Sequence, residues 1–216
     1  MTISKPIVAF DFDGTLTGSD SFNAFLLWRV PPHRFVLGLL RLTPALVSYA
    51  FNRDRGRLKS AAITEFLAGW TPKAVTEEAA RFAGWSWDRF MRPDALAKWD
   101  EWKASGATMV IVTASPAITV EPFARRLGAD VLIGTRLKLD PEGRIAGPLA
   151  GENCRAAEKV VRLRERFGSD VTLAAAYGDT SGDIEMLEIA NEKGYRVFTG
   201  WPKSGIGMIK LTFARQ

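Results

Sequence analysis

Ile7-Val8-Ala9-Phe10-Asp11-Phe12-Asp13-Gly14-Thr15-Leu16-Thr17 is the stretch that decides the fold of this chain. Its apolar beginning predicts a strand that is buried on both faces. Asp11 and Asp13 follow two positions apart, so both carboxylates can lie on one side of an extended chain, and Gly14 then allows a tight turn. Two acids at the end of a buried strand repel each other and lose hydration. They favour a cation site, or a nucleophile with a proton-transfer partner, over an acidic and solvated turn.

The composition is that of an ordinary globular protein. Hydrophobic residues make up 47% of the 216 residues and charged residues 25%, which leaves ample material for a buried core. Cys154 is the single cysteine, so no intramolecular disulfide can form. The single histidine, His33, stands between Pro32 and Arg34. The sequence therefore argues against a histidine-based metal site and a Ser-His-Asp triad.

Positive charge is concentrated in one segment of the chain. Residues 21–92 contain eleven lysines and arginines against five acids, a net charge of +6, whereas the whole chain carries +5. The same segment holds four of the seven tryptophans. This shift in composition predicts an inserted helical cap over residues 20–92, with residues 1–19 and 93–216 forming the core domain.

The most apolar run, residues 35–51, lies within this predicted cap. It is shorter than the about 20 residues of a spanning helix, and Arg41 and Pro44 interrupt it, so we do not expect a transmembrane span. Two interpretations remain open, a kinked pair of buried helices or a segment in the membrane interface. Cations beside an apolar surface are typical of contact with anionic lipid, although a solvated helix end has the same composition. The cations that follow the run are Arg53, Arg55, Arg57 and Lys59.

Helices and strands alternate outside the predicted cap. We expect strands over residues 108–112, 130–133, 171–177 and 195–198, and helices over residues 93–105, 117–127, 153–167 and from about 184 to 190. A small β-hairpin is expected over residues 135–149, and within the cap helices are expected over 21–30, 35–51, 58–69, 72–82 and 85–90. The alternation predicts an α/β fold with a doubly wound parallel sheet. In such sheets, ligands bind beyond the carboxyl ends of the strands.

Polar side chains follow three of these predicted strands. They are the pairs Asp11 and Asp13, Thr113 and Ser115, and Asp179 and Asp183. Each of the last two pairs alone fits an ordinary turn, and Lys159 alone fits a solvated helix face. Together, and in this order along the chain, they resemble the four motifs of the haloacid dehalogenase superfamily, whose phosphatases use an aspartate nucleophile. The first motif is Asp-Phe-Asp-Gly-Thr-Leu-Thr, and the fourth is Gly-Asp-Thr-Ser-Gly-Asp.

The resemblance implies a role for each of these residues. Asp11 would be the nucleophile that forms an aspartyl-phosphate, and Asp13 would protonate the leaving group and then deprotonate water. Asp11, Asp179 and the backbone carbonyl of Asp13 would bind Mg²⁺, the hard cation that oxygen ligands prefer, with Asp183 supporting them. Phosphate would be held by Thr113, Lys159 and the backbone amides of Phe12 and Ala114.

The substrate is less well defined by the sequence. The cap resembles that of the subfamily containing phosphoserine phosphatase, but the second motif is Thr-Ala-Ser rather than Ser-Gly-Gly. The cap glutamate of that enzyme has no counterpart here unless Asp20 substitutes for it. An apolar, tryptophan-rich and basic cap is more similar to the bacterial phosphatidylglycerophosphatase C-like proteins. We therefore expect an anionic lipid phosphate such as phosphatidylglycerophosphate, with a small soluble ester such as phosphoserine as the alternative. The cap residues that we expect to meet the substrate are Asp20, Arg53, Arg55 and Arg57.

The sequence fits an enzyme better than a non-catalytic membrane-binding module or a nucleic-acid binder. A membrane-binding module without catalysis would be free to lose the costly buried charges of the motifs. A nucleic-acid binder would display aromatic residues for stacking, whereas here their spacing is that of a helix core. We expect no nucleic-acid partner. No signal peptide fits before Ile7, so we expect a cytoplasmic protein, peripheral at the inner face of the membrane if the apolar run contacts lipid.

Overall fold

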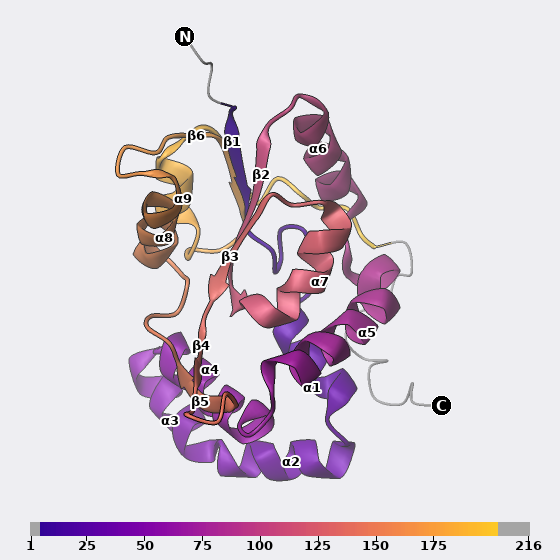
Figure 1. Ribbon diagram of the computed structural model, residues 1–216, viewed down its shortest axis with the longest axis vertical. Coiled ribbons are helices and arrows are strands. Elements are labelled where there is room, and N and C mark those ends of the chain that lie inside the picture. The colour runs from indigo at the N-terminus through magenta and orange to yellow at the C-terminus, as the bar shows by residue number, and fades with distance from the viewer. Residues whose placement is uncertain (1–4, 203–216) are drawn as a thin grey trace.

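A sheet of five parallel strands forms the core of the protein. The computed structural model describes residues 5–202. The order across the sheet is β3 (Val131–Thr135), β2 (Thr108–Pro116), β1 (Ile7–Phe10), β6 (Leu173–Gly178) and β7 (Ala190–Tyr195), and every neighbouring pair is parallel (Figure 1). β1 is central, and the chain adds strands first on one side of it and then on the other. The predicted doubly wound sheet is confirmed, and its strand order reverses at β1, the strand that Asp11 directly follows.

Alternate residues of β1 face opposite sides of the sheet. Val8 and Phe10 belong to one buried cluster, and Ala9 belongs to another, as the two-residue period of a strand requires. α6 (Pro93–Ala104) and α7 (Ala117–Leu127) cover the first side, and α8 (Ala157–Phe167) and α9 (Ile184–Glu188) cover the second (Figure 1). Both faces of the central strand are thus sealed from water, and its polar end is left at the edge of the sheet.

Five helices follow β1 and form the cap. They are α1 (Ser21–Arg29), α2 (Pro32–Arg41), α3 (Thr43–Asn52), α4 (Arg55–Leu67) and α5 (Pro72–Phe90). Side chains cap three of them, because Asp20, Asp54 and Thr71 accept hydrogen bonds from the first turns of α1, α4 and α5. The ring of Phe82 on α5 contacts those of Phe25 on α1 and Phe123 on α7, at 5.7 and 6.1 Å between centroids. An aromatic cluster therefore joins the cap to the core.

The predicted β-hairpin forms, and it packs on the cap. β4 (Leu137–Leu139) and β5 (Ile145–Leu149) are antiparallel. The amide of Gly69 donates to the carbonyl of Ile145 at 2.9 Å, and the amide of Ile145 donates to the carbonyl of Trp70 at 2.8 Å. A side chain at Gly147 would approach Thr64 Oγ1 to 2.4 Å, so glycine lets the hairpin lie directly on α4. Residues that follow β3 in sequence therefore complete the cap in space.

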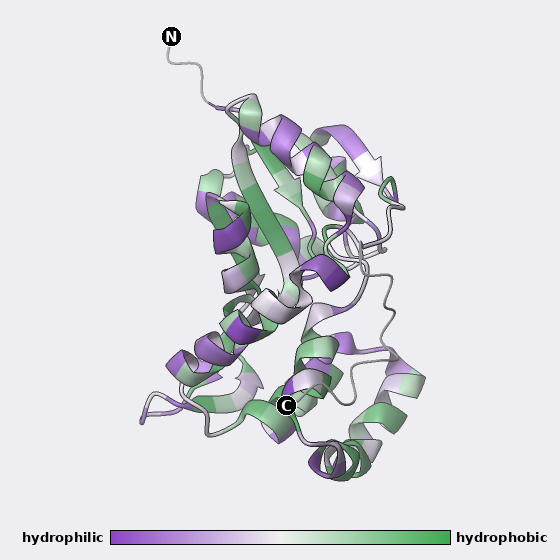
Figure 2. Ribbon diagram, turned by 90° about the vertical axis from the view of Figure 1, so that its right-hand side faces the viewer, coloured by the Kyte–Doolittle hydropathy of each residue, from purple (hydrophilic) through white to green (hydrophobic). Residues whose placement is uncertain are grey.

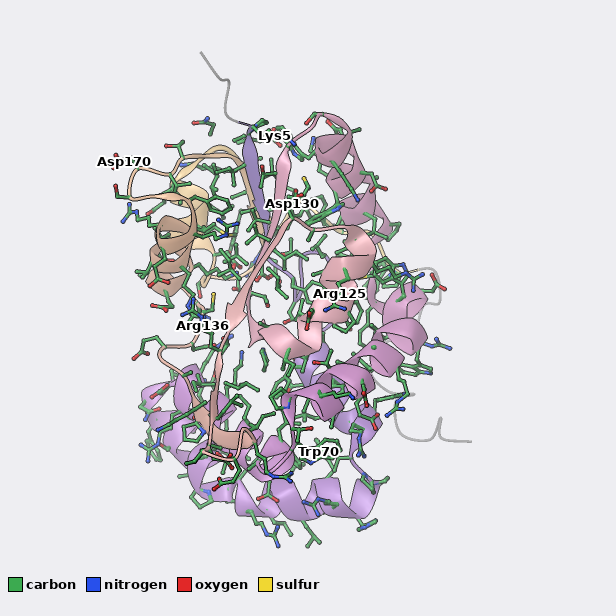
Figure 3. The ribbon with its side chains drawn as sticks, viewed as in Figure 1. Lys5, Trp70, Arg125, Asp130, Arg136 and Asp170 are labelled. Carbon is green, nitrogen blue, oxygen red and sulfur yellow. The ribbon has the colours of Figure 1, made fainter. Side chains whose placement is uncertain are left out.

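The chain passes between core and cap in two hydrogen-bonded pairs of segments. In the first pair, the amide of Gly18 donates to the carbonyl of Phe90 at 2.7 Å, and the amide of Arg92 donates to that of Leu16 at 2.9 Å. In the second pair, the amide of Ala150 donates to the carbonyl of Arg136 at 2.9 Å. Arg136 lies between β3 and β4, where the chain leaves the sheet (Figure 3). The outgoing and returning segments are thus paired at both crossings.

Several predicted elements have different bounds in the structure. The predicted helices 72–82 and 85–90 are one helix, α5, because no residue between them breaks the helix. The predicted strand 195–198 is wrong: the last strand is β7, which begins at Ala190 and pairs with β6. α8 begins at Ala157 rather than at 153, after Ala156 with its positive φ of 56°. The chain must turn sharply there before the helix starts.

No single helix among residues 5–202 has the length and apolar composition needed to cross a membrane. α2 and α3 meet that criterion only when taken together, and they are bent by 54° at the break between them.

Candidate active site

The loop after β1 brings Asp11 into line with the neighbouring strand. Its amide donates to the carbonyl of Tyr177 on β6 at 2.9 Å, so the backbone keeps its sheet spacing for one more residue. The chain then turns through Gly14, whose φ is +89°. A Cβ atom at Gly14 would lie 2.2 Å from Asp179 Oδ2. Only glycine allows this loop to approach the loop that follows β6.

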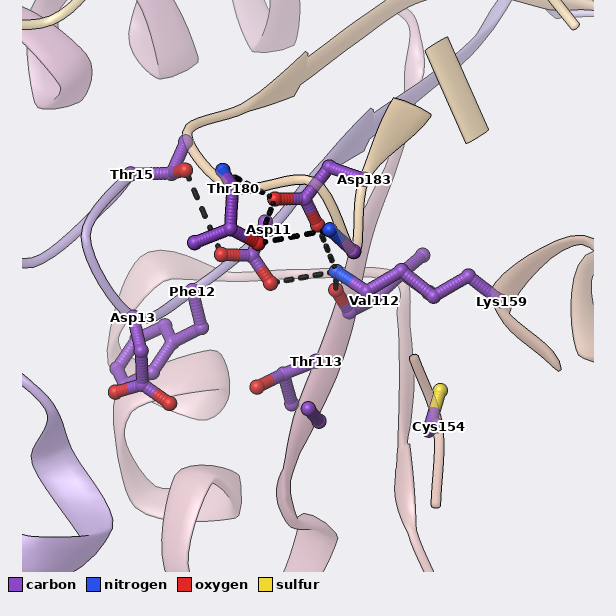
Figure 4. Close-up of polar contacts among 12 residues, drawn as sticks. Asp11, Phe12, Asp13, Thr15, Val112, Thr113, Cys154, Lys159, Thr180 and Asp183 are labelled. Carbon is purple, nitrogen blue, oxygen red and sulfur yellow. Dashed lines mark hydrogen bonds and ion pairs between the residues drawn. The ribbon is translucent and has the colours of Figure 1, made fainter. Parts of the chain in front are cut away.

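Lys159 is the centre of a buried cluster of charges. Its Nζ donates to Asp11 Oδ1, Asp183 Oδ1 and the carbonyl oxygen of Val112, each at 2.6 Å (Figure 4). The lysine is 1% exposed and Asp11 is 6% exposed. All three donors of the ammonium group have an acceptor, which a buried lysine requires. The ammonium fixes one oxygen of Asp11, while within the described part of the chain Oδ2 has only a long contact of 3.5 Å from Thr15 Oγ1.

The pKa values of this cluster follow from burial and charge. Burial raises the pKa of Asp11 to about 7, with Lys159 opposing the shift and Asp183 and Asp13 adding to it. Burial acts in the same direction on Asp183, but the charge of Lys159 and the hydrogen bonds from Lys159 and Thr180 outweigh it and lower the pKa of Asp183. For Lys159 burial would lower the pKa, yet the two carboxylates outweigh it and raise the value. The lysine therefore stays charged, and Asp11 is the carboxylate most in need of a further cation.

Three carboxylates converge where such a cation would bind. Asp11, Asp179 and Asp183 each offer an oxygen atom, and these atoms lie within 4.8 Å of one another. Asp179 Oδ1 is buried and has no hydrogen-bond partner among residues 5–202, and burial raises the pKa of this residue. An unpaired buried carboxylate oxygen is costly. Its position beside two other carboxylates therefore fits a hard divalent cation such as Mg²⁺. The structure brings the predicted ligands Asp11 and Asp179 together, with Asp183 beside them.

Asp13 is turned away from this cluster (Figure 4). Its Oδ1 accepts from the amide of Ser21, the first residue of the cap, at 2.7 Å. Its Oδ2 accepts from Ser115 Oγ at 2.5 Å. The side chain therefore points toward the space between core and cap, and only the backbone carbonyl of Asp13 is left for the metal contact that the sequence predicts.

The predicted phosphate-binding residues lie next to Asp11. Thr113 is fully buried, and its Oγ1 accepts from the amide of Ser115 at 3.0 Å. The carbonyl of Ala114 accepts from Thr135 Oγ1 at 2.7 Å, which fixes the carboxyl end of β2. The ring of Phe12 is fully buried and packs against Phe123 at 5.2 Å between centroids, so only the backbone of Phe12 can contact a ligand.

A cavity of about 560 Å³ joins these residues to the cap. Of the predicted cap candidates, Asp20 and Arg55 line it. Arg53 lines a neighbouring cavity of about 540 Å³, which shares Arg55 with the first, and Arg57 lines neither. Residues for which the sequence predicted no role at the site also line the first cavity, namely Lys59, Arg92, Ser115, Asn153 and Arg155.

Lys59 extends from the cap into this site. Its Nζ donates to the carbonyl of Ala114 at 2.5 Å. Burial lowers the pKa of Lys59, and the carboxylates of Asp13 and Asp20 oppose this shift. The spacing carried a signal for it: Lys59 stands one helical turn after Arg55, so the two share a face of α4. Ser115 likewise stands two residues after Thr113 on an extended segment.

The chain matches the family model of haloacid dehalogenase-like hydrolases over residues 8–188. It belongs to this family. Protein CicA of Caulobacter vibrioides is 62% identical over 196 residues, which cover 91% of this chain and 88% of that protein. A Streptomyces azureus protein described as an inhibition of morphological differentiation protein is 28% identical over 193 residues, 87% of this chain and 70% of that protein.

Solved structures share the fold of this family member. A Bordetella pertussis protein of unknown function has a TM-score of 0.72 at 20% identity, with 88% of each chain covered. A substrate-bound phosphoserine phosphatase has a TM-score of 0.57 at 18% identity, covering 89% of this chain and 86% of that one. A phospho-aspartyl intermediate analogue of phosphoserine phosphatase has a TM-score of 0.56 at 20% identity, covering 88% and 85%. The chain is thus a hydrolase of this family whose fold is shared with phosphatases.

Proposed function

We propose that this hydrolase cleaves phosphate monoesters through an aspartyl-phosphate on Asp11. The observation that carries the proposal is the unequal treatment of the two oxygens of Asp11. Oδ1 is held by Lys159 at 2.6 Å, while Oδ2 has only the long contact with Thr15 among the residues that the structure describes. A carboxylate oriented by one oxygen presents the other as a nucleophile.

The bonds of the reaction balance across two steps. In the first, Asp11 Oδ2 forms a bond to phosphorus as the bond to the leaving oxygen breaks, and the carboxyl group of Asp13 gives its proton to that oxygen. In the second, Asp13 takes a proton from water, the water oxygen bonds to phosphorus, and the bond to Asp11 breaks. Mg²⁺ held by Asp11 and Asp179, with Asp183 beside them, would offset the charge of the phosphate dianion. Thr113 would donate to a phosphoryl oxygen, and the positive charge of Lys159 would offset the charge of the phosphate.

The cavity supports an anionic lipid phosphate, such as phosphatidylglycerophosphate, as the substrate. Arg55 and Arg155 line both this cavity and its neighbour, so anionic groups beyond the reacting phosphate would meet positive charge. Tyr49, Leu58 and Ala62 add an apolar wall from α3 and α4. An amphiphilic ester combines these two kinds of contact. Such a substrate would place the enzyme peripherally at the inner face of the membrane.

A small soluble ester such as phosphoserine is the second candidate. Asp20 lines the cavity and caps α1, accepting from the amide of Asn23 at 2.8 Å. A carboxylate at this position offers an acceptor for a substrate ammonium group. Asp20→Asn would weaken use of phosphoserine selectively under this alternative, and would leave a lipid phosphate without an ammonium group unaffected.

Phosphate release from three substrates tests the proposal. The purified protein is offered vesicles containing phosphatidylglycerophosphate, phosphoserine and an aryl phosphate, each with Mg²⁺ and with EDTA. We expect Mg²⁺-dependent release, fastest from the vesicles. Faster release from phosphoserine would replace the lipid substrate by the soluble one. Absence of release from all three, with the protein folded, would contradict the proposed reaction on these substrates.

A further inference from the structure

Large apolar side chains are exposed on one small part of the cap. Among residues 5–202, seven of the thirteen exposed large hydrophobic residues lie on α2 and α3, which together span only residues 32–52. α2 and α3 lie at the lower end of the molecule in Figure 1, and the helices at that end include green, hydrophobic segments in Figure 2. We call this surface the α2–α3 face; its members are Val36, Leu37, Leu39, Leu40, Leu46, Val47 and Phe51.

The rest of the protein covers little of these two helices. α3 has no buried residue, and the buried residue of α2 is Gly38. A Cβ atom at Gly38 would lie 2.4 Å from the ring of Phe66 on α4, and the ring of Phe35 stacks on Phe66 at 5.3 Å between centroids. One side of α2 is therefore attached to α4, and the remaining apolar sides face outward. Helices as apolar as α3 are normally buried, so an exposed one indicates a missing partner.

The charges around the face identify the chemistry of that partner. Residues 32–57 contain five arginines and one acid, Asp54, and α2 and α3 themselves contain no acid. In a symmetric dimer the same face would meet its copy, which would bring arginines against arginines. A surface of anionic lipid supplies both an apolar layer and the opposite charge.

We propose that the α2–α3 face docks on an anionic lipid bilayer. Each of the two helices has 10 residues, about 15 Å of helix, and the bend of 54° between them suits a pair lying within the interface. Tyr49 of α3 lines the catalytic cavity, so the helix that contacts lipid is also a wall of the active site. Docking would bring the active site to a substrate that lies in the bilayer. In this respect the inference rests on the proposed function, the hydrolysis of a lipid phosphate.

Vesicle binding tests the docking surface apart from catalysis. Co-sedimentation is measured with vesicles of phosphatidylcholine alone and of phosphatidylcholine with phosphatidylglycerol, since neither lipid is a phosphate monoester. The test variant is Leu40→Glu with Phe51→Glu, at positions 65% and 87% exposed. We expect the wild type to bind the anionic vesicles better, and the double variant to lose more than about tenfold in binding.

Val161→Glu is the matched control, because Val161 is a 45% exposed apolar residue on α8, away from the cap. It should bind vesicles like the wild type. All variants should hydrolyse the aryl phosphate at the wild-type rate, which shows that they are folded. Undiminished binding by the double variant overturns the proposal, as does failure of the wild type to bind. A wild-type dimer that the double variant dissociates would assign the face to a second copy. Binding lost on deletion of residues 203–216 but kept by the double variant would assign it to that segment.

Discussion

The core sheet and the α2–α3 face use similar residues with opposite results. Met109, Val110, Ile111 and Val112 of β2 are all fully buried, whereas Leu40 and Phe51 are 65% and 87% exposed. In the sheet, apolar side chains are covered by helices of the same chain on both faces. On the α2–α3 face, no segment among residues 5–202 covers these apolar side chains in the same way. Hydrophobic runs in one sequence thus serve two purposes, stability in the sheet and, under our proposal, attachment on the cap.

Asp11→Asn should produce the largest effect on the core side of this comparison. Loss of the nucleophile is expected to lower phosphate release from an aryl phosphate by more than about a thousandfold. The variant should still bind anionic vesicles, because the α2–α3 face is unchanged. Asp170→Asn, in an exposed loop before β6 (Figure 3), serves as the control and should keep full activity. Retention of a tenth of the activity by Asp11→Asn would contradict the assignment of the nucleophile.

Lys159→Met, set beside a substitution of an exposed lysine, compares how much a buried charge and an exposed charge contribute to stability. Removal of the ammonium leaves Asp11 and Asp183 without their shared partner, and the expected cost is about 3–5 kcal/mol in the free energy of unfolding. Lys73→Met is the counterpart on the cap, where Lys73 is 87% exposed and 4.0 Å from Glu77; exposed pairs contribute about 1 kcal/mol or less. Urea unfolding at neutral pH measures both. Equal costs at the two positions would contradict the account of the buried cluster.

Two alanine substitutions test the apolar residues themselves. Ile111→Ala in the sheet should cost about 2–5 kcal/mol of stability because it leaves a cavity. Leu40→Ala on the α2–α3 face should change stability by no more than about 0.5 kcal/mol, and it should weaken vesicle binding. Thermal unfolding and co-sedimentation give the two readouts. A large loss of stability in Leu40→Ala would show that α2 packs more tightly than its exposure indicates.

The pH dependence of stability tests the raised pKa of Asp11 directly. Burial raises the pKa of Asp11 from 3.8 to about 7 in the metal-free protein. Between these pH values the folded state holds a proton that the unfolded chain has released. Asp11 therefore makes the free energy of unfolding fall as the pH rises through this window. Above it, both states have released the proton, and Asp11 adds no further pH dependence. The difference in melting temperature between wild type and Asp11→Asn, both in EDTA, isolates this contribution. A difference that does not vary across the window would contradict the raised pKa.

The sequence predicted the local parts of the site well. The β1 loop could be placed because a buried strand and two acids stand next to each other in the chain. The placement of Asp11 and Asp183 at the same end of a parallel sheet follows from the fold class. The place of Lys159, a helix residue, followed from the resemblance to the family's motifs and not from the fold class.

The sequence could not reveal contacts made across the cap. Lys59 reaches Ala114 because α4 lies over the end of β2. Its spacing from Arg55 places both residues on one face of α4, but it does not show that this face is turned toward the site. β7 was misplaced for a related reason. It is an edge strand with Asn191, Glu192 and Lys193 exposed, so it lacks the apolar run that marked the other strands. The position of the hairpin on α4 likewise depends on pairing between distant segments.

The two paired crossings between core and cap have a mechanical consequence. A lobe joined to a body by one flexible linker can swing in any direction and can also twist. Here one crossing lies at Gly18 and Phe90 and the other at Arg136 and Ala150, and each is tied by backbone hydrogen bonds. Two hydrogen-bonded crossings restrict the motion of the cap more than one linker would, and the contact of Phe82 on α5 with Phe123 on α7 attaches it at a further place. Opening of the cavity with both crossings still paired would therefore require the packing of α5 on α7 to shift, and it would displace α2 and α3 together with the rest of the cap.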